Sequence, residues 1–102
     1  VSDRIDTLLF EEHQPLDENV FRDFLAQLPP EMLRAKGVVR LATSKGRDVE
    51  YLLQVAGSRV TLEARKRKTL DEKGAKILFL GRGMDNEVLR ARLASCVSAG
   101  ER

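Results

Sequence analysis

The chain has few of the residues that carry most kinds of site chemistry. It contains one cysteine, one histidine and no tryptophan, and aromatic residues make up 5% of its 102 residues. A single cysteine excludes an internal disulfide and fits a reducing compartment, so we expect a cytoplasmic protein. A structural zinc site needs about four N or S ligands, so we expect no metal site from this chain alone.

Long apolar runs and a strong excess of one charge are also lacking. No run approaches the ~20 residues of a membrane span, and the first residues lack the pattern of a signal peptide. We therefore expect no contact with a membrane. Lys and Arg number 18 against 16 Asp and Glu, a net charge of +2. Such a weak overall field provides no general case for binding nucleic acid.

Motifs for catalysis are missing as well. A phosphate-binding loop needs G-x-x-x-x-G-K-[ST], but glycine and lysine occur together here only in other orders, as in Lys36-Gly37 and Lys73-Gly74. The serines have no recognisable motif, and no base–nucleophile or carboxylate pair stands out. We therefore expect no catalytic residue, no cofactor-binding residue and no enzymatic activity in this chain.

Residues 5–28 predict a strand followed by a helix. Residues 5–12 are rich in Ile, Leu and Phe, as strands are. Asp17 is a plausible N-cap, and Pro29-Pro30 ends the helix because neither proline can donate a backbone hydrogen bond. The expected buried stripe of the helix is Val20, Phe21, Phe24, Leu25 and Leu28.

The rest of the chain predicts four strands and a second helix. Residues 33–42, 49–56 and 59–64 alternate apolar and polar side chains, and Gly57-Ser58 predicts a tight hairpin turn. Residues 77–80 form a continuous apolar run, which suits a strand covered on both faces. Asp85 can cap the last helix. Its expected buried stripe is Val88, Leu89, Leu93, Cys96 and Val97.

The order β-α-β-β-β-β-α indicates a single α+β domain over residues 1–102, with a mostly antiparallel sheet of four or five strands. Both helices are expected on the same face of the sheet. Because the first helix is a crossover connection, the first two strands are expected to run parallel.

Alternation along the strands then predicts what each face carries. The expected core face takes Val39, Leu41, Tyr51, Leu53, Val55, Val60, Leu62, Ile77 and Phe79. The opposite face is too apolar for a surface that only contacts water, and it is our candidate interaction face. Leu8 or Phe10 is expected to join it. Its residues are Lys36, Val38, Arg40, Glu50, Leu52, Gln54, Leu78 and Leu80.

Five segments in order resemble the C-terminal domain of the CobW, or cobalamin-synthesis-protein, family. None is decisive alone, but together they cover nearly the whole chain. They are Gln14-Pro15-Leu16-Asp17, Leu33-Arg34-Ala35-Lys36-Gly37-Val38-Val39, Gln54-Val55-Ala56-Gly57, Ile77-Leu78-Phe79-Leu80-Gly81-Arg82 and a short C-terminal helix containing Cys96.

The resemblance implies that this chain is a non-catalytic C-terminal domain of a larger GTP-binding protein, with a regulatory or partner-docking role. Family members are similar to P-loop GTPases at their N-terminal end and are linked to metal delivery or cobalamin synthesis. GTP, Mg²⁺ and zinc or cobalt are therefore implied for an N-terminal domain outside this chain. The implied partners are the GTPase domain of the same polypeptide, to which Lys36 is a candidate contact, a metalloprotein client, and a second copy of the domain.

Three local clusters suggest alternatives. The basic residues 65–68 suggest a free-standing nucleic-acid-binding domain, although no aromatic residues are interleaved and acidic residues follow. Glu11-Glu12-His13 offers ligand atoms, but neighbours on a strand point to opposite faces. Gly81-Arg82-Gly83 precedes a helix, yet the third glycine of a dinucleotide fingerprint is missing. We interpret the last two as a strand end and a strand exit.

Overall fold

The computed structural model describes residues 4–65 and 74–97. Its strands and helices follow the predicted order, with one short extra strand before the first helix. The elements are β1 (Asp6–Glu12), β2 (Leu16–Asp17), α1 (Glu18–Ala26), β3 (Met32–Ala42), β4 (Asp48–Ala56), β5 (Arg59–Ala64), β6 (Ala75–Gly81) and α2 (Asn86–Ala94).

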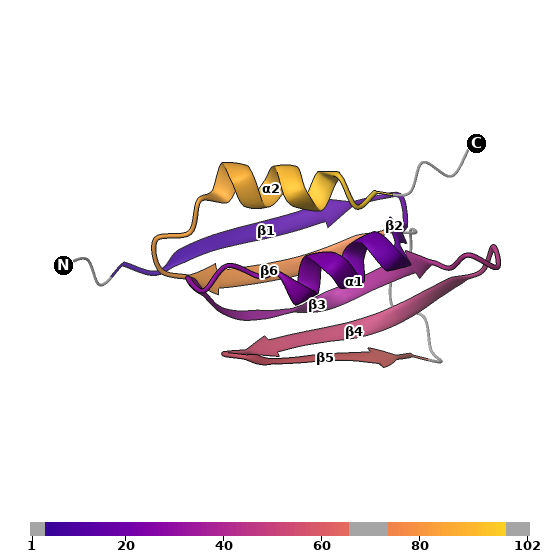
Figure 1. The fold of residues 1–102 in the computed structure, drawn as a ribbon, viewed down its shortest axis with the longest axis horizontal. Helices are drawn as coiled ribbons and strands as arrows, with labels where there is room; N and C mark the ends of the chain where they lie inside the picture. The colour runs from indigo at the N-terminus through magenta and orange to yellow at the C-terminus, as the bar shows by residue number, and fades with distance from the viewer. Residues whose placement is uncertain (1–3, 66–73, 98–102) are drawn as a thin grey trace.

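The strands form one sheet in the order β1-β6-β3-β4-β5, and each pair of neighbours is antiparallel. The two-residue β2 adds a short parallel pairing to β3. In Figure 1, α1 lies in front of β6 and β3, and α2 runs along β1. Buried side chains of both helices belong to one core. The predicted α+β class, with an antiparallel sheet and two helices on one face, is confirmed.

The position of β6 was not predicted. β1 and β3 do run parallel, because each is antiparallel to β6, but β6 lies between them. The chain therefore forms a split β-α-β unit, in which α1 carries the chain across a gap that a later strand fills. β6 is therefore an interior strand of the sheet, with both of its edges paired.

Each helix begins at the predicted cap. The Asp17 carboxylate accepts a hydrogen bond from the backbone N–H of Val20 at 3.0 Å, and Asp85 does the same for Val88 at 3.2 Å. Each bond satisfies one of the backbone N–H groups that have no partner within the helix. The caps therefore set where both helices start on the sheet.

The predicted stripes of the two helices need correction. Val20 and Val88 are 40% and 53% exposed. Each valine stands one residue before a buried side chain, Phe21 or Leu89, and one residue is about 100° around a helix. Both valines therefore face away from the sheet.

The end of the second stripe lies beyond α2. Ser95 is the C-cap of this helix, so Cys96 and Val97 belong to the turn that follows it. Cys96 is buried, and Val97 forms an isolated bridge with Leu16.

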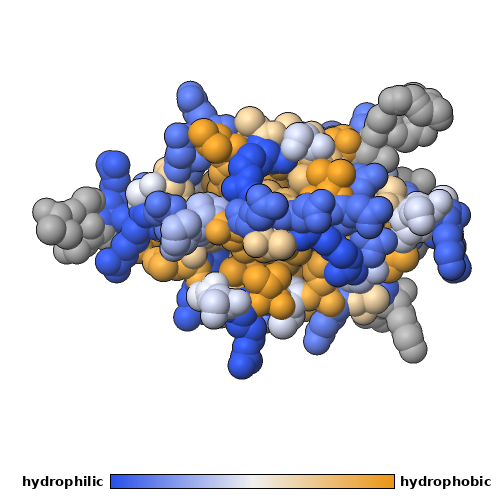
Figure 2. Space-filling view, in the orientation of Figure 1, coloured by the Kyte–Doolittle hydropathy of each residue, from blue (hydrophilic) through white to orange (hydrophobic). Residues whose placement is uncertain are grey.

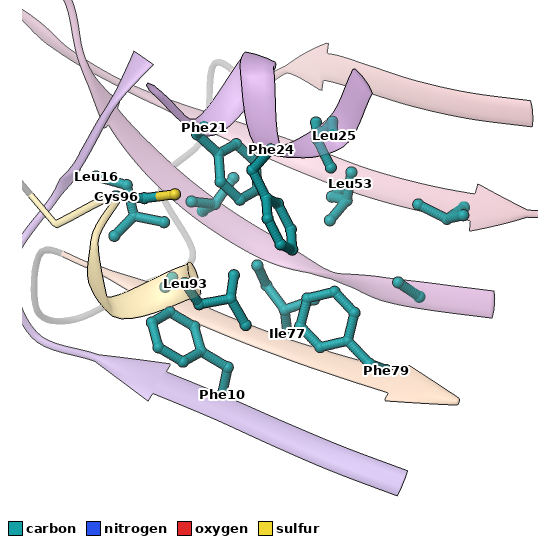
Figure 3. Packing of buried hydrophobic residues seen from close by; sticks show 14 of the residues in the cluster. Phe10, Leu16, Phe21, Phe24, Leu25, Leu53, Ile77, Phe79, Leu93 and Cys96 are labelled. Carbon is teal, nitrogen blue, oxygen red and sulfur yellow. The ribbon is translucent and has the colours of Figure 1, made fainter. Parts of the chain in front are cut away.

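The core lies between the helices and one face of the sheet (Figure 3). The Phe24 ring from α1 meets the Phe79 ring of β6 edge-on, with centroids 6.4 Å apart. Leu93 brings α2 to the same layer. The buried apolar side chains of the strands are Leu8, Phe10, Leu16, Met32, Ala35, Val39, Leu41, Leu53, Val55, Ala75, Ile77 and Phe79.

Three expectations about the faces were wrong in detail. Leu8 and Phe10 lie in the core, and Leu9 takes the opposite face, because the register pairs Leu8 with Phe79. Val60 lies on the predicted face, opposite Val55, but is exposed because it belongs to the edge strand β5. The β6 run is not covered on both faces, since Leu78 is exposed.

Polar side chains cover much of the helical side of the molecule in Figure 2, where apolar residues remain visible beside α1, towards β4 and β5. The helix layer thus covers the middle of the sheet and leaves its β5 edge open on this side.

Loss of the first cap is expected to cost about 1 kcal/mol of stability. In Asp17→Ala, the backbone N–H of Val20 loses its acceptor. The melting temperature should fall by about 4–8 °C, measured by circular dichroism. Asp17→Asn keeps an acceptor and Asp23→Ala changes an exposed carboxylate on the same helix, so both should stay near wild type. An equal loss in Asp23→Ala would contradict this role for Asp17.

Candidate interaction surface

One face of the sheet carries no helix among the described residues, and we call it the open face. All eight residues predicted for the interaction face lie on it. The strand register places them opposite one another. The cross-strand pairs are Lys36 with Leu78, Lys36 with Gln54, Val38 with Leu52, and Arg40 with Glu50.

Apolar side chains of the open face are accessible to solvent. Leu78 in β6 is 42% exposed, and its cross-strand neighbour Leu9 in β1 is 45% exposed. Val38, Leu52 and Leu80 are half-buried among their neighbours. The open face is therefore an apolar surface with charged residues around it.

Arg40 and Glu50 are the exceptions, because both are buried on this face. Their exposed fractions are 3% and 2%, and Arg40 Nη2 lies 3.4 Å from Glu50 Oε1. Arg65 Nε lies 3.8 Å from the other carboxylate oxygen. Charges are tolerated in such surroundings only when paired. These two residues therefore hold the sheet together rather than presenting charge to a partner.

A hollow of about 360 Å³ lies at the end of the open face where β3 begins. Its volume falls near the lower end of the range for binding pockets, about 300–1,000 Å³. Apolar and basic side chains line it together. The side chains on this face are Arg34, Lys36, Gln54, Ala56, Leu78 and Leu80.

The sequence-based prediction omitted several members of this surface. Arg34 and Ala56 are cross-strand partners on the open face, and Arg59 pairs with Ala56. Leu9 was assigned to the wrong side. The alternation that selected Lys36 would have found Arg34 if continued by two residues, and the hairpin register would have added Arg59.

The alternative sites are not assembled in the described part of the chain. Arg65, the first residue of the basic cluster, pairs with Glu50, and residues 66–68 lie outside the described residues. Glu11 Oε2 lies 3.8 Å from Lys76 Nζ, whereas Glu12 accepts a hydrogen bond from the backbone N–H of Gln14. Among residues 4–65 and 74–97, no three His, Cys, Asp or Glu side chains gather closely enough to hold a metal ion.

The start of α2 is occupied by the protein's own carboxylates. Asp85 caps the helix, and the Asp6 carboxylate accepts a hydrogen bond from the backbone N–H of Met84 at 3.0 Å. A helix N-terminus attracts anions through its backbone N–H groups. Here Asp85 satisfies one N–H group of the first helical turn, and Asp6 holds the backbone just before the cap, so we interpret the Gly81-Arg82-Gly83 segment as a strand exit.

Cys96 is buried in the turn after α2. Its Sγ donates a hydrogen bond to the carbonyl of Arg92 at 3.4 Å. Burial raises the pKa of the thiol; nearby Arg92 opposes the shift, and Asp17 adds to it. The raised pKa and the burial keep the thiol protonated and unreactive.

Cys96 should therefore react with the thiol reagent DTNB at least about tenfold more slowly in the native chain than in urea. Because folding raises the pKa, its stabilising contribution is present below the ordinary thiol pKa of about 8.5 and is lost as the pH rises above it. As the pH rises above about 8.5, the free energy of unfolding of the wild type should fall relative to that of Cys96→Ala. Fast labelling of the native chain would contradict this assignment.

Comparison with known families decides what kind of domain this is. Residues 5–97 match the model of the cobalamin synthesis protein cobW C-terminal domain. The chain belongs to the CobW C-terminal domain family. No curated protein sequence matches it. Among its described residues, no helix is long and apolar enough to cross a membrane.

Solved structures agree with the CobW fold. The Zn(II)-bound YjiA GTPase from E. coli superimposes with a TM-score of 0.72 at 19% sequence identity. A Zn(II)-bound triple mutant of YjiA GTPase has a TM-score of 0.70 at 20% identity. Each match covers 92% of this chain and 30% of the other. The CobW C-terminal domain described here thus spans about 30% of the length of those proteins.

Proposed function

We propose that this CobW C-terminal domain is a non-catalytic docking module of a GTP-binding protein, and that its open face binds the GTPase domain of the same polypeptide. The observation that carries the proposal is the solvent exposure of Leu9 and Leu78 on a sheet face that no described helix covers. Exposed apolar patches of this kind commonly mark interaction sites. Docking would remove these side chains from water.

The family membership supports a GTPase parent. The YjiA structures that share this fold are named as Zn(II)-bound GTPases. In our proposal the parent binds GTP and Mg²⁺ through its other domain and delivers zinc or cobalt to a metalloprotein client or to cobalamin synthesis. The domain described here supplies contacts rather than chemistry, and it works in the cytoplasm, where a free thiol stays reduced.

Leu78→Glu tests the docking surface. Position 78 is more exposed than the half-buried Leu52, so a charge there should leave the fold intact. The wild-type chain, mixed with the purified GTPase domain of its parent, should bind measurably by calorimetry. Leu78→Glu should weaken that binding at least about tenfold, because an apolar contact becomes a buried charge.

Val88→Glu is the matched control. It places the same charge on an exposed valine of α2, on the helical side of the sheet. It should bind the GTPase domain like wild type. Equal binding of the GTPase domain by both variants would contradict the proposal. If the chain self-associates in sedimentation and only Leu78→Glu abolishes this, the face binds a second copy instead.

A further inference from the structure

Charges on the open face are distributed unevenly along the strands. Three basic residues, Arg34, Lys36 and Arg59, lie at the end where β3 and β5 begin. The strand positions beside them on this face are apolar or uncharged. These positions are Thr7, Leu9, Gln54, Ala56, Thr61, Leu78 and Leu80.

The other end of the open face has no excess of positive charge among the described residues. It carries four acidic and three basic side chains. They are Glu11, Asp48, Glu50 and Glu63 against Arg40, Arg65 and Lys76. The contacts already described pair Glu11 with Lys76, and Glu50 with both Arg40 and Arg65. In the described part of the chain, the excess positive charge of this face therefore belongs to the end that carries Arg34, Lys36 and Arg59.

No carboxylate of the described residues neutralises the three cations at that end. Arg34, Lys36 and Arg59 are exposed, and none of them forms an ion pair within the described residues. The hollow of about 360 Å³ lies among the first two, with Leu78 and Leu80 as its apolar part. A binding surface thus combines an apolar floor with a basic rim.

We propose that this basic end of the open face binds an acidic peptide segment, in which carboxylates flank apolar side chains. The proposal rests on the docking function above and specifies the chemistry of the segment that docks. Apolar side chains of the segment enter the hollow, while its Asp or Glu residues meet Arg34, Lys36 and Arg59. Charge complementarity of this kind selects the partner and its register.

Two other occupants fit less well. A second copy of the domain is a poor match, because three of the four described carboxylates at the far end of its open face, those of Glu11, Asp48 and Glu50, already interact with other groups of the domain. A single-stranded nucleic acid stacks its bases on aromatic side chains, and the strand positions of the open face hold no aromatic residue in the described part of the chain. An acidic peptide uses both the basic rim and the apolar floor.

The test uses three synthetic peptides of about eight residues, which span about 26 Å when extended. One alternates leucine with glutamate, and the others replace every glutamate by lysine or by glutamine. Fluorescence anisotropy with the isolated chain should detect binding of the glutamate peptide only. Added salt should weaken this binding, because exposed charges are screened. Equal binding of the lysine peptide, or tighter binding of an oligouridylate, would overturn the proposal.

Charge reversal locates the binding site. The double variant Arg34→Glu/Lys36→Glu should bind the glutamate peptide at least about tenfold more weakly. Lys45→Glu, which reverses an exposed lysine in the loop between β3 and β4, should bind it unchanged. Arg34→Gln/Lys36→Gln provides a milder version in case the reversed pair disturbs folding. Unchanged binding in both double variants would overturn the proposal.

The same variants separate this proposal from the docking function. If Leu78→Glu loses the GTPase domain but both double variants keep it, docking stands and the acidic segment is wrong. If no variant affects the GTPase domain while Arg34 and Lys36 still control the peptide, the basic end stands and its partner lies elsewhere.

Discussion

Glu50→Ala is expected to lower the free energy of unfolding by about 3–5 kcal/mol, the cost of breaking a buried ion pair. Glu50 and Arg40 lie directly opposite each other on β4 and β3, and both are almost fully buried. Without the carboxylate, the Arg40 guanidinium stays buried with its charge uncompensated. Arg40 Nε already has no hydrogen-bond partner within the described structure, which leaves little to replace the lost contact.

A double-mutant cycle shows whether the pair is responsible. Arg40→Met/Glu50→Leu removes both charges and keeps apolar volume, so it should cost much less than the sum of Arg40→Met and Glu50→Leu. Urea unfolding followed by circular dichroism measures the free energy of unfolding of the double variant and of both single variants, relative to wild type. Glu63→Ala, which removes an exposed carboxylate from β5, should stay within about 0.5 kcal/mol of wild type. Additive losses around the cycle would mean that the two side chains act independently.

Gly37→Val is expected to destabilise the domain by about 3 kcal/mol, at the upper end of the range for overpacking. A Cβ at position 37 would press against the carbonyl oxygen of Lys76 and lie 2.6 Å from the Cα of Ile77. Both atoms belong to the backbone of β6, which cannot move away as a flexible side chain can. The close approach of β3 and β6 therefore depends on glycine.

Gly57→Asn is the control for losing a glycine. Gly57 has a φ of 62° in the β4–β5 turn, and a Cβ there would meet nothing within 4 Å. Asparagine tolerates this left-handed conformation better than most residues, so the cost should be small. The comparison uses urea unfolding of both variants. A loss below about 1 kcal/mol in Gly37→Val would show that β6 yields more easily than the geometry indicates.

Local patterns in the sequence predicted most elements of this fold. Alternation placed Lys36 and Leu78 on one face and Val39 and Ile77 on the other, because a strand repeats every two residues. Asp17 and Asp85 marked both helix starts, since a capping side chain acts on its own neighbours. Such features depend on short stretches of chain and can therefore be read without knowing the tertiary structure.

Features that depend on distant segments were harder to predict. Nothing local says that β6 separates β1 from β3, because strand neighbours are chosen by the fit of whole faces. The register of β1 was ambiguous for the same reason, which is why Leu8 and Phe10 were misassigned. Val20 and Val88 appeared equivalent to their buried neighbours until the direction of the sheet was known.

The candidate surface was predicted in position but not in all its properties. Its eight residues follow from alternation alone. The burial of Arg40 and Glu50 depends on their facing each other across two strands, and the unpaired state of Arg34 and Arg59 depends on the whole surrounding surface. Exposure and pairing are tertiary properties, so the structure was needed to separate the end of the face whose charges are paired from the basic end.

The place of β6 between β1 and β3 has a consequence for biosynthesis. A ribosome releases β1, α1 and the β3–β4–β5 meander before it makes β6, so β1 must wait for the strand with which it pairs along its whole length. During that interval β1 has no neighbouring strand, whereas β3 and β4 can already pair through a short loop. The nascent domain therefore leaves Leu8 and Phe10 without their place in the sheet until residues 75–81 leave the exit tunnel.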